Sequence, residues 1–405
     1  MKQDADAKSI IAEKCKSADV DGKISVAKRL DNIGEYYFSQ KLREIDELNK
    51  AGKQVINLGI GSPDLPPHDD VIKVLQEESA RPNTHAYQNY KGSPILRNAI
   101  SQWYKKWYDV ELNPDSEILP LIGSKEGIMH ICMTYLNEGD AVLIPNPGYP
   151  TYRSAAKIAG ATLIEYILKE ENNWFPDFEE LEKNDLSKVK LMFVNYPHMP
   201  TGQLPTRAFF DQLVSFAGKH QILLCHDNPY SFILNKNPLS LLQAEGAKDV
   251  AVELNSLSKS HNMAGWRIGI LSGNKERIAE VLRFKSNMDS GMFLPLQLAA
   301  AKALELGIDW HDNLNSVYEK RRLKVFELLE LLGCACDKKQ AGMFVWAAIP
   351  PEYKDGYALS DKILYEANVF ITPGGIFGSA GDKYIRVSLC TTIEKIEEAI
   401  NRIKN

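Results

Sequence analysis

The segment SLSKSHNMAGWRIG, residues 256–269, follows the apolar run VAVELN and interrupts its pattern with hydroxyl and cationic side chains. Lys259 lies between two serines, and Arg267 follows behind a Gly-Trp pair. A single lysine after a strand is most often a solvated side chain. Two cations and several hydroxyls in one loop instead favour a site for a phosphate group and a reactive amine. Ser256, Lys259 and Arg267 are therefore candidate site residues.

A carboxyl group lies at a comparable position in HDNPY, residues 226–230. Asp227 directly follows the apolar run ILLC, and Tyr230 comes three residues later. An acid at the end of a buried strand either caps the next helix or pairs with a buried cation. By itself the segment fits the cap best, and both interpretations stay open.

Two further segments place polar or aromatic groups after strands. GSKEG (residues 123–127) begins a helix, where Ser124, Lys125 and free backbone N–H groups can bind an anion. Any well-capped junction between a strand and a helix looks similar. PNPGYPTY (residues 145–152) brings Tyr149 and Tyr152 to the end of another strand, where tyrosines most often simply pack.

The order of elements predicts how these segments meet. From about residue 70 to residue 295, apolar strands alternate with amphipathic helices, which is typical of a parallel sheet covered on both faces. In such a sheet the carboxyl ends of the strands share one edge, where ligands bind. The converging amine, acid, aromatic rings and phosphate site are the groups that hold and use pyridoxal phosphate.

The remaining segments predict a smaller α+β part. Residues 26–52 read as a helix that ends at Gly52, VINLGIG reads as a strand, and a long helical run begins near residue 297. We expect a polar extension at residues 1–25, an N-terminal arm and part of a small domain at 26–60, a large domain at 61–295 and a small C-terminal domain at 296–405.

Bulk properties exclude several classes of protein. The chain has 405 residues, 44% of them apolar, and a formal net charge of −5 with both signs interspersed. This favours neither nucleic acid nor a membrane surface as partner. The six cysteines lack metal-ligand spacing, so we expect reduced thiols and no metal site. The N-terminus lacks the apolar core of a signal peptide, so the sequence predicts a cytoplasmic protein.

From about residue 26 to its C-terminus, the chain resembles the class I and II aminotransferases of fold type I. Six motifs occur in the order found in that family: INLGIGSPDL, HAYQNYKGSPILRNAI, GSKEG, PNPGYP, HDNPY and SLSKSHNMAGWRIG, with GGIFGSAGDKYIRVSLC after them. The resemblance implies a large domain with a mostly parallel seven-stranded sheet between helices, and a smaller α+β domain from the N-terminal segment and the C-terminal part.

The resemblance also implies a role for each candidate residue. Lys259 would form the Schiff base and move protons in a ping-pong exchange between an L-amino acid and a 2-oxo acid. Asp227 would face the pyridine nitrogen and Tyr230 the ring oxygen. The other implied contacts are Ser124, Lys125, Ser256 and Arg267 with the phosphate, Tyr149 stacked on the ring, Gly61 in the segment over the substrate, Arg386 with the substrate α-carboxylate, and Tyr87 with the phosphate of a partner subunit in a homodimer.

The loop NYPHMPTG, residues 195–202, departs from the family pattern. Relatives usually carry an asparagine that donates to the ring oxygen where this chain has Met199, which has no donor. Asn195 matches the first asparagine of the loop and is expected to brace it. We expect Tyr230 to serve the ring oxygen alone or together with His198 or a water molecule.

Other functions remain open at this point. The same cofactor site supports lyase chemistry such as β-elimination, so another fold type I enzyme acting on amino acids is the main alternative. Some relatives are transcriptional regulators, but residues 1–25 are too few for a helix-turn-helix domain. A nicotinamide dehydrogenase could use GIGS at residues 59–62, which lacks the full GxGxxG and leaves Lys259 and Asp227 unexplained.

Overall fold

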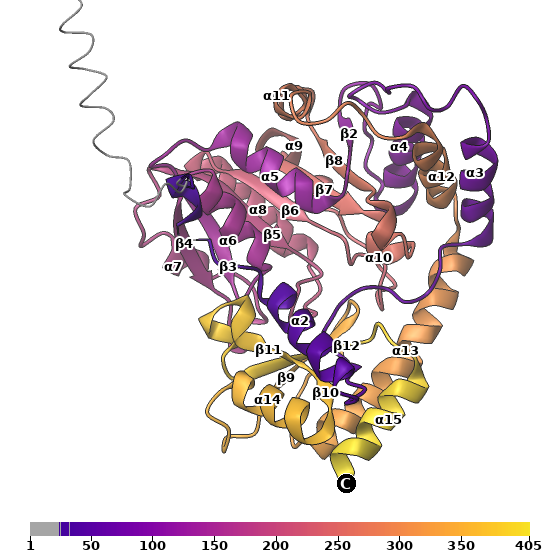
Figure 1. The fold of residues 1–405 in the computed structure, drawn as a ribbon. Helices are drawn as coiled ribbons and strands as arrows, with labels where there is room; N and C mark the ends of the chain where they lie inside the picture. Colours follow the sequence, from indigo (N-terminus) through magenta and orange to yellow (C-terminus); the bar gives the residue numbers. More distant parts are fainter. Residues whose placement is uncertain (1–23, 25, 32) are drawn as a thin grey trace, which may run out of the picture. The chain divides into compact units, whose positions relative to one another are not determined.

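The computed structural model describes residues 24, 26–31 and 33–405 (Figure 1). The chain divides into two units, Met1–Gly34 and Glu35–Asn405. In the first unit the described element is the 3-10 helix η2 (Lys28–Leu30). The polar extension expected at residues 1–25 lies outside the described residues except for Ile24. No helix of the described part is long and apolar enough to cross a membrane.

The second unit is built around a seven-stranded sheet with the strand order β2-β8-β7-β6-β5-β3-β4. Its strands are β2 (Ile118–Leu121), β3 (Ala141–Asn146), β4 (Thr162–Ile167), β5 (Val189–Asn195), β6 (Leu223–Asp227), β7 (Ala251–Ser256) and β8 (Gly269–Gly273). The neighbours from β4 to β7 are parallel, whereas β8 is antiparallel to both β7 and β2. The mostly parallel seven-stranded sheet expected from the sequence is confirmed.

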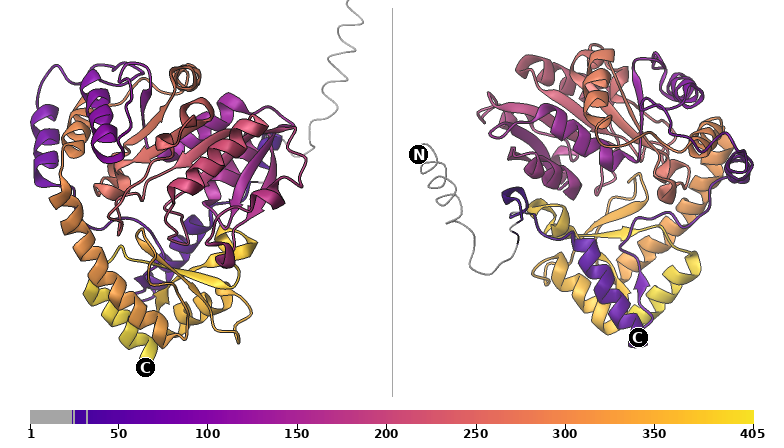
Figure 2. Two further views of the ribbon diagram at one scale, coloured as in Figure 1. Left: turned by 180° about the vertical axis from the view of Figure 1, so that it is seen from behind. Right: turned by 45° about the horizontal axis from the view of Figure 1, so that its top comes forward.

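Helices cover both faces of this sheet (Figure 2). One face packs against α5 (Ser124–Tyr135), α6 (Pro150–Ile158) and α11 (Lys275–Lys285), and the other against α4 (Pro94–Tyr108), α8 (Arg207–His220) and α9 (Ala247–Val250). Side chains alternate between the faces, so Cys225 of β6 lies on the first face and Leu224 on the second. Since both faces are buried, the strands are apolar almost throughout, as parallel strands usually are.

The C-terminal part forms a smaller sheet with helices around it. β9 (Phe344–Ala348), β11 (Thr372–Pro373) and β12 (Tyr384–Ser388) pair antiparallel in the order β11-β12-β9, and β1 (Ile56–Asn57) pairs parallel with β10 (Val369–Phe370). The helices here are α2 (Tyr37–Lys50), α13 (Ile308–Leu331), α14 (Gly356–Ala367) and α15 (Ile393–Lys404). The residue boundaries proposed for the domains stay a prediction.

The remaining helices connect these parts. They are α3 (Asp69–Ser79), α7 (Phe178–Leu181), α10 (Leu257–Ser260) and α12 (Leu294–Leu304), with short 3-10 segments η3 (Glu170–Asn172), η4 (Leu241–Gln243), η5 (Ala264–Trp266), η6 (Gly374–Phe377) and η7 (Ser379–Gly381). α12 packs on α3 and α4, and α13 packs on α15. The helical run expected from about residue 297 therefore consists of two helices, α12 and α13. Gly307, directly before α13, lies in the break between them.

Two other element predictions were wrong in extent. The helix expected over residues 26–52 begins only at Tyr37, because Gly34 disfavours helix and Tyr36 is extended with φ −60° and ψ 124°. The strand expected in VINLGIG covers only two residues. It ends where the Asn57 side chain accepts hydrogen bonds from the N–H groups of Gly59 (3.0 Å) and Ile60 (3.2 Å), which turns the chain out of the ladder.

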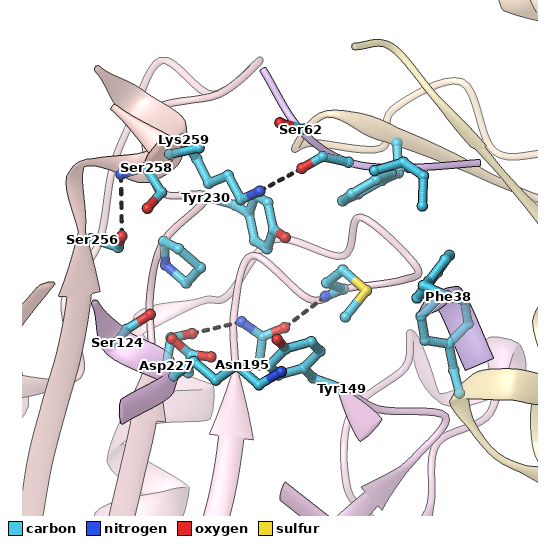
Figure 3. A pocket seen from close by; sticks show the side chains of 18 of the residues that line it. Phe38, Ser62, Ser124, Tyr149, Asn195, Asp227, Tyr230, Ser256, Ser258 and Lys259 are labelled. Carbon is cyan, nitrogen blue, oxygen red and sulfur yellow. Dashed lines mark hydrogen bonds between the residues drawn. The ribbon is translucent and has the colours of Figure 1, made fainter. Parts of the chain in front are cut away.

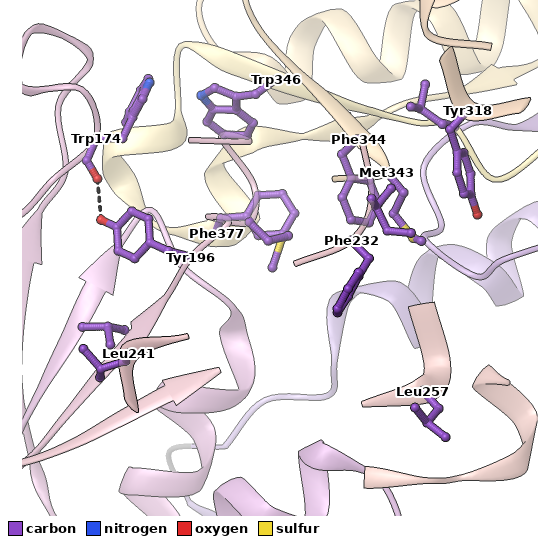
Figure 4. Close-up of a cluster of buried hydrophobic side chains, with 14 of the residues drawn as sticks. Trp174, Tyr196, Phe232, Leu241, Leu257, Tyr318, Met343, Phe344, Trp346 and Phe377 are labelled. Atoms are coloured by element: carbon purple, nitrogen blue, oxygen red, sulfur yellow. Dashed lines mark hydrogen bonds between the residues drawn. The ribbon is translucent and has the colours of Figure 1, made fainter. Parts of the chain in front are cut away.

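Buried aromatic rings join the end of β5 to the smaller sheet (Figure 4). Trp346 stacks on Tyr384 at 5.0 Å between ring centroids, and Tyr196 donates its hydroxyl hydrogen bond to the Trp174 carbonyl oxygen at 2.6 Å. A buried tyrosine needs such a partner because an unpaired hydroxyl in an apolar core is costly. The cluster fixes the loop after β5 against the C-terminal part.

A buried neutral histidine makes the core sensitive to acid. His311 stacks on Phe232 at 4.4 Å, and neither of its ring nitrogens has a hydrogen-bond partner among the described residues. Burial, helped by the nearby Lys106 charge, lowers the pKa of His311 to about 4. In the unfolded chain the pKa of this histidine is near 6.5. Between pH 6.5 and pH 4 the unfolded chain therefore binds a proton at His311 that the folded chain does not bind. The free energy of unfolding falls as the pH drops through this range.

His311→Phe is expected to keep the stack and remove this proton uptake. Between pH 7 and pH 5 the variant should lose about 2 kcal/mol less of its free energy of unfolding than the parent protein. Urea unfolding at the two pH values measures the difference. Equal losses of the free energy of unfolding in the two proteins would show that the pKa of His311 does not differ between the folded and unfolded states.

Candidate active site

A cavity of about 480 Å³ opens at the carboxyl ends of β5, β6 and β7 (Figure 3). The structure brings ten of the sequence-predicted site residues into its lining: Gly61, Ser124, Lys125, Tyr149, Asp227, Tyr230, Ser256, Lys259, Arg267 and Arg386. The eleventh, Tyr87, is 91% exposed and lies outside the lining. Its expected contact with a partner subunit stays a prediction.

Lys259 lies on α10, the single helical turn that follows β7. Its Nζ atom donates to the Gly61 carbonyl oxygen at 2.5 Å, which ties the segment after β1 to the cavity (Figure 3). Burial lowers the pKa of the Lys259 amine, and the charges of Arg386 and Arg267 act in the same direction. A lowered pKa leaves more of the amine neutral near physiological pH, as a nucleophile or base requires.

Asp227 ends β6 with its carboxylate in the cavity. Oδ2 accepts a hydrogen bond from the Tyr152 hydroxyl at 2.8 Å, whereas Oδ1 is buried without a partner among the described residues. Burial raises the pKa of Asp227 to about 6. No helix of the described part begins at Asp227, so the cap interpretation is wrong, and a buried carboxylate oxygen without a partner suits a cation.

A cradle for an anion forms where α5 begins. A side chain at Gly269 would come within 2.5 Å of the Ser124 backbone nitrogen, and one at Gly123 would meet the Arg267 guanidinium at 2.1 Å. The glycines thus let Arg267 and the first N–H groups of α5 share one small space, and a helix N-terminus favours negative charge. The Ser256 hydroxyl caps α10 by accepting from the Ser258 N–H at 3.1 Å.

Arg386 of β12 is a buried cation without an acidic partner among the described residues. Nη2 donates to the Gly59 carbonyl oxygen at 2.8 Å, Nε has no partner, and the guanidinium carbon lies 3.8 Å from the Phe344 ring centroid. Burial lowers the pKa of Arg386 to about 10. A desolvated, incompletely bonded guanidinium is suited to a planar carboxylate.

The loop after β5 is a binding-site element. Asn195 donates to the Asp227 carbonyl oxygen at 2.6 Å and accepts from the Met199 N–H at 2.8 Å, so it braces the loop. Met199 lines the cavity with its Sδ atom 3.2 Å from Arg386 Nη1. His198 is not among the lining residues, and its Nδ1 atom lies 2.8 Å from the Thr201 hydroxyl oxygen. The suggestion that His198 assists Tyr230 stays a prediction.

Sequence reasoning missed several lining residues. Tyr152 was noted as a packed tyrosine, yet it is the hydrogen-bond partner of Asp227; its position two residues into a helix that follows a strand was the available signal. Tyr36 and Phe38 reach the cavity from the start of α2, and Phe344 and Phe377 reach it from the C-terminal part. No local pattern marks these four as site residues.

A family model described as aminotransferase class I and II matches residues 53–403. The chain belongs to this family. It is accordingly a transaminase, which exchanges an amino group between an amino acid and a 2-oxo acid. The family and fold imply pyridoxal phosphate as the cofactor.

Related proteins agree over nearly the whole chain. An LL-diaminopimelate aminotransferase of Dehalococcoides mccartyi is 40% identical over 94% of this chain and 98% of its own length, and the enzyme of that name from Aquifex aeolicus is 39% identical over 93% and 98%. Among solved structures, apo-BacF from Bacillus subtilis is 38% identical with a TM-score of 0.91, and the match covers 94% of this chain and 98% of that one.

The described residues fit pyridoxal phosphate. The cofactor has a dianionic phosphate, a basic ring nitrogen and an aldehyde, and the cavity offers an anion cradle, a carboxylate with an unpartnered oxygen and a buried amine. Among the described lining side chains four are cationic (Lys125, Lys259, Arg267 and Arg386) and one, Asp227, is a carboxylate. This excess of positive charge suits a phosphate together with a substrate carboxylate.

Proposed function

We propose that this cavity is the transamination site, that Lys259 is its catalytic amine and that Arg386 binds the α-carboxylate of the amino acid. The observation that carries the proposal is a pair of buried charged groups that line the cavity with Lys259 and have no opposite charge paired with them among the described residues. They are the Asp227 carboxylate, whose Oδ1 atom has no hydrogen-bond partner, and the Arg386 guanidinium, whose Nε atom has none. Each is a buried polar group that requires an opposite charge, and a cofactor and a substrate supply one each.

Each side chain has a distinct task. Bound pyridoxal phosphate supplies an electron sink that withdraws charge from the α-carbon of the substrate. Asp227 holds a proton on the ring nitrogen, Arg267 and the α5 N-terminus hold the phosphate, and Arg386 orients the carboxylate. The Lys259 amine, once released from the Gly61 carbonyl oxygen, would take the proton from the substrate α-carbon and later donate it again, which general acid–base catalysis by a lysine of lowered pKa allows.

We also propose that the enzyme is a homodimer with shared active sites, in which exposed Tyr87 reaches the phosphate bound by its partner. The observation in support is the exposure of a tyrosine in the segment that resembles the family's partner-contacting motif. Sedimentation analysis tests the dimer directly.

The substrate side chain meets a largely apolar wall of Tyr36, Phe38, Leu42, Phe344 and Phe377. Among the described lining residues no second carboxylate is available for a distal ammonium group. Relatives named LL-diaminopimelate aminotransferase make that amino acid one donor to test, whereas the apolar wall favours aromatic and aliphatic amino acids.

The test combines a spectrum with a substrate screen. Purified protein titrated with pyridoxal phosphate is expected to show a visible absorption band that shifts when an amino-acid donor is added. A screen of LL-diaminopimelate, aromatic and aliphatic donors against 2-oxo acids should yield the matching products. Ammonia release without amino transfer would instead support the lyase alternative, and no band at all would contradict the cofactor assignment.

A further inference from the structure

Behind the active-site edge, β6 and β7 carry a buried ionisable pair that the proposed mechanism does not use. His226 and Glu253 are fully buried, and His226 Nδ1 lies 2.8 Å from Glu253 Oε2. The other ring nitrogen of His226 lies 2.9 Å from the Tyr196 carbonyl oxygen, in the loop after β5. The pair therefore links the penultimate residue of β6 to the interior of β7 and to the first residue after β5.

Hydrogen-bonding groups surround this pair. Glu253 Oε2 accepts from the Ser240 hydroxyl at 2.9 Å and the Leu241 N–H at 3.0 Å, and Oε1 accepts from the Tyr104 hydroxyl at 3.0 Å. Each ring nitrogen of His226 lies within hydrogen-bond distance of an oxygen atom, one on Glu253 and one on the Tyr196 carbonyl group. An imidazolium donates from both nitrogens, so this arrangement suits a protonated His226 beside a Glu253 carboxylate.

We propose that the buried His226–Glu253 pair is ionised and positions this active site, by linking β7 to the carboxyl ends of β5 and β6 and by presenting a cation behind Asp227. The ends of these three strands carry the Asn195 brace, the Asp227 carboxylate and the turn that bears Lys259. The inference rests on the proposed function, because it assigns these residues a role at that same site.

The pair acts on Asp227 through the strand. Successive side chains of β6 point to opposite faces, so His226 lies behind the sheet while Asp227 faces the cavity. Burial raises the pKa of Asp227, whereas the Tyr152 hydrogen bond and the His226 charge oppose the rise. Tyr149, Tyr230 and Cys225 are further titratable groups near Asp227, and Phe210 of α8 packs uncharged on the His226 ring.

The first test uses the ligand-free full-length protein. Nitrogen-15 NMR of labelled histidine is expected to show, at about pH 8, one ring with both nitrogens protonated. Glu253→Gln should abolish that signal, because a buried imidazolium without its counter-ion loses its proton. A parent protein without a doubly protonated ring would overturn the proposal. This readout needs no cofactor, so it stands even if the proposed function fails.

The second test follows the dissociation constant for pyridoxal phosphate from about pH 5 to pH 8. Binding should weaken as Asp227 becomes protonated, and His226→Gln should move the midpoint of that loss upward by about one pH unit. His220→Gln is the matched control, because it removes a histidine from the remote His220–Glu182 pair and should leave the midpoint unchanged. If His226→Gln does not fold, the midpoint is measured in Glu253→Gln instead. An unshifted midpoint in a folded His226 or Glu253 variant would overturn the proposal.

Discussion

Lys259→Ala is expected to lower kcat for transamination by about 10⁴-fold or more, because one amine serves as nucleophile and as proton carrier. The structure leaves no substitute close by: Lys125, the other lysine in the described lining, is placed with its ammonium 4.8 Å from the Tyr36 ring centroid. Single-turnover and steady-state rates with the best donor measure the loss. The visible band of the cofactor should be altered in the same variant.

Two matched variants separate chemistry from charge. Lys259→Arg keeps a cation but cannot act as nucleophile or base, so its rate should be as low as that of Lys259→Ala. Lys248→Ala removes a lysine that does not line the cavity and whose Nζ atom lies 3.0 Å from Glu117 Oε1. The transamination rate of this variant should match that of the parent protein. Substantial activity in Lys259→Arg would mean that the positive charge, and not the amine, is what the reaction needs.

Arg386→Leu is expected to lower kcat/KM by about 10³-fold, since truncating a desolvated, bidentate ion pair costs about 3–5 kcal/mol. The loss should be specific to the carboxylate. An amine that resembles the best donor but lacks the α-carboxylate should react equally slowly with the parent and the variant. Steady-state kinetics with the two substrates measures this ratio.

Stability provides the control for Arg386. In the ligand-free protein this guanidinium is buried, and the Gly59 carbonyl oxygen is its one oxygen acceptor among the described residues. Replacing it with an apolar side chain should therefore leave the unfolding temperature unchanged or raise it. Arg386→Lys should fall between parent and Leu in kcat/KM, because a lysine keeps the charge without the planar fork. A variant that loses stability along with activity would indicate that Arg386 supports the fold instead of the substrate.

Much of the fold and site follows from local sequence. Strand and helix periodicity predicted the parallel sheet, and the polar residues that interrupt each strand end mark Ser124, Asp227 and Lys259 as neighbours at one edge. This works because all parallel strands place their carboxyl ends on the same side, so position along the chain translates into position in space. The N-terminal helix was placed too early, because the pattern before Tyr37 resembles a helix although Gly34 interrupts it.

Contacts between distant residues were decided by the tertiary structure alone. Tyr152 meets Asp227 across 75 residues, Arg386 meets Met199 across 187, and the rings of α2 reach the cavity wall from the far end of the chain. The His226–Glu253 pair is likewise invisible locally, since the two residues lie 27 positions apart on different strands. The sequence by itself determined which groups stand at strand ends. The packing of the helices and the C-terminal part determined which of those groups acquire partners. Asp227 and Arg386 stay buried without an opposite charge among the described residues, and this leaves both ready to bind one.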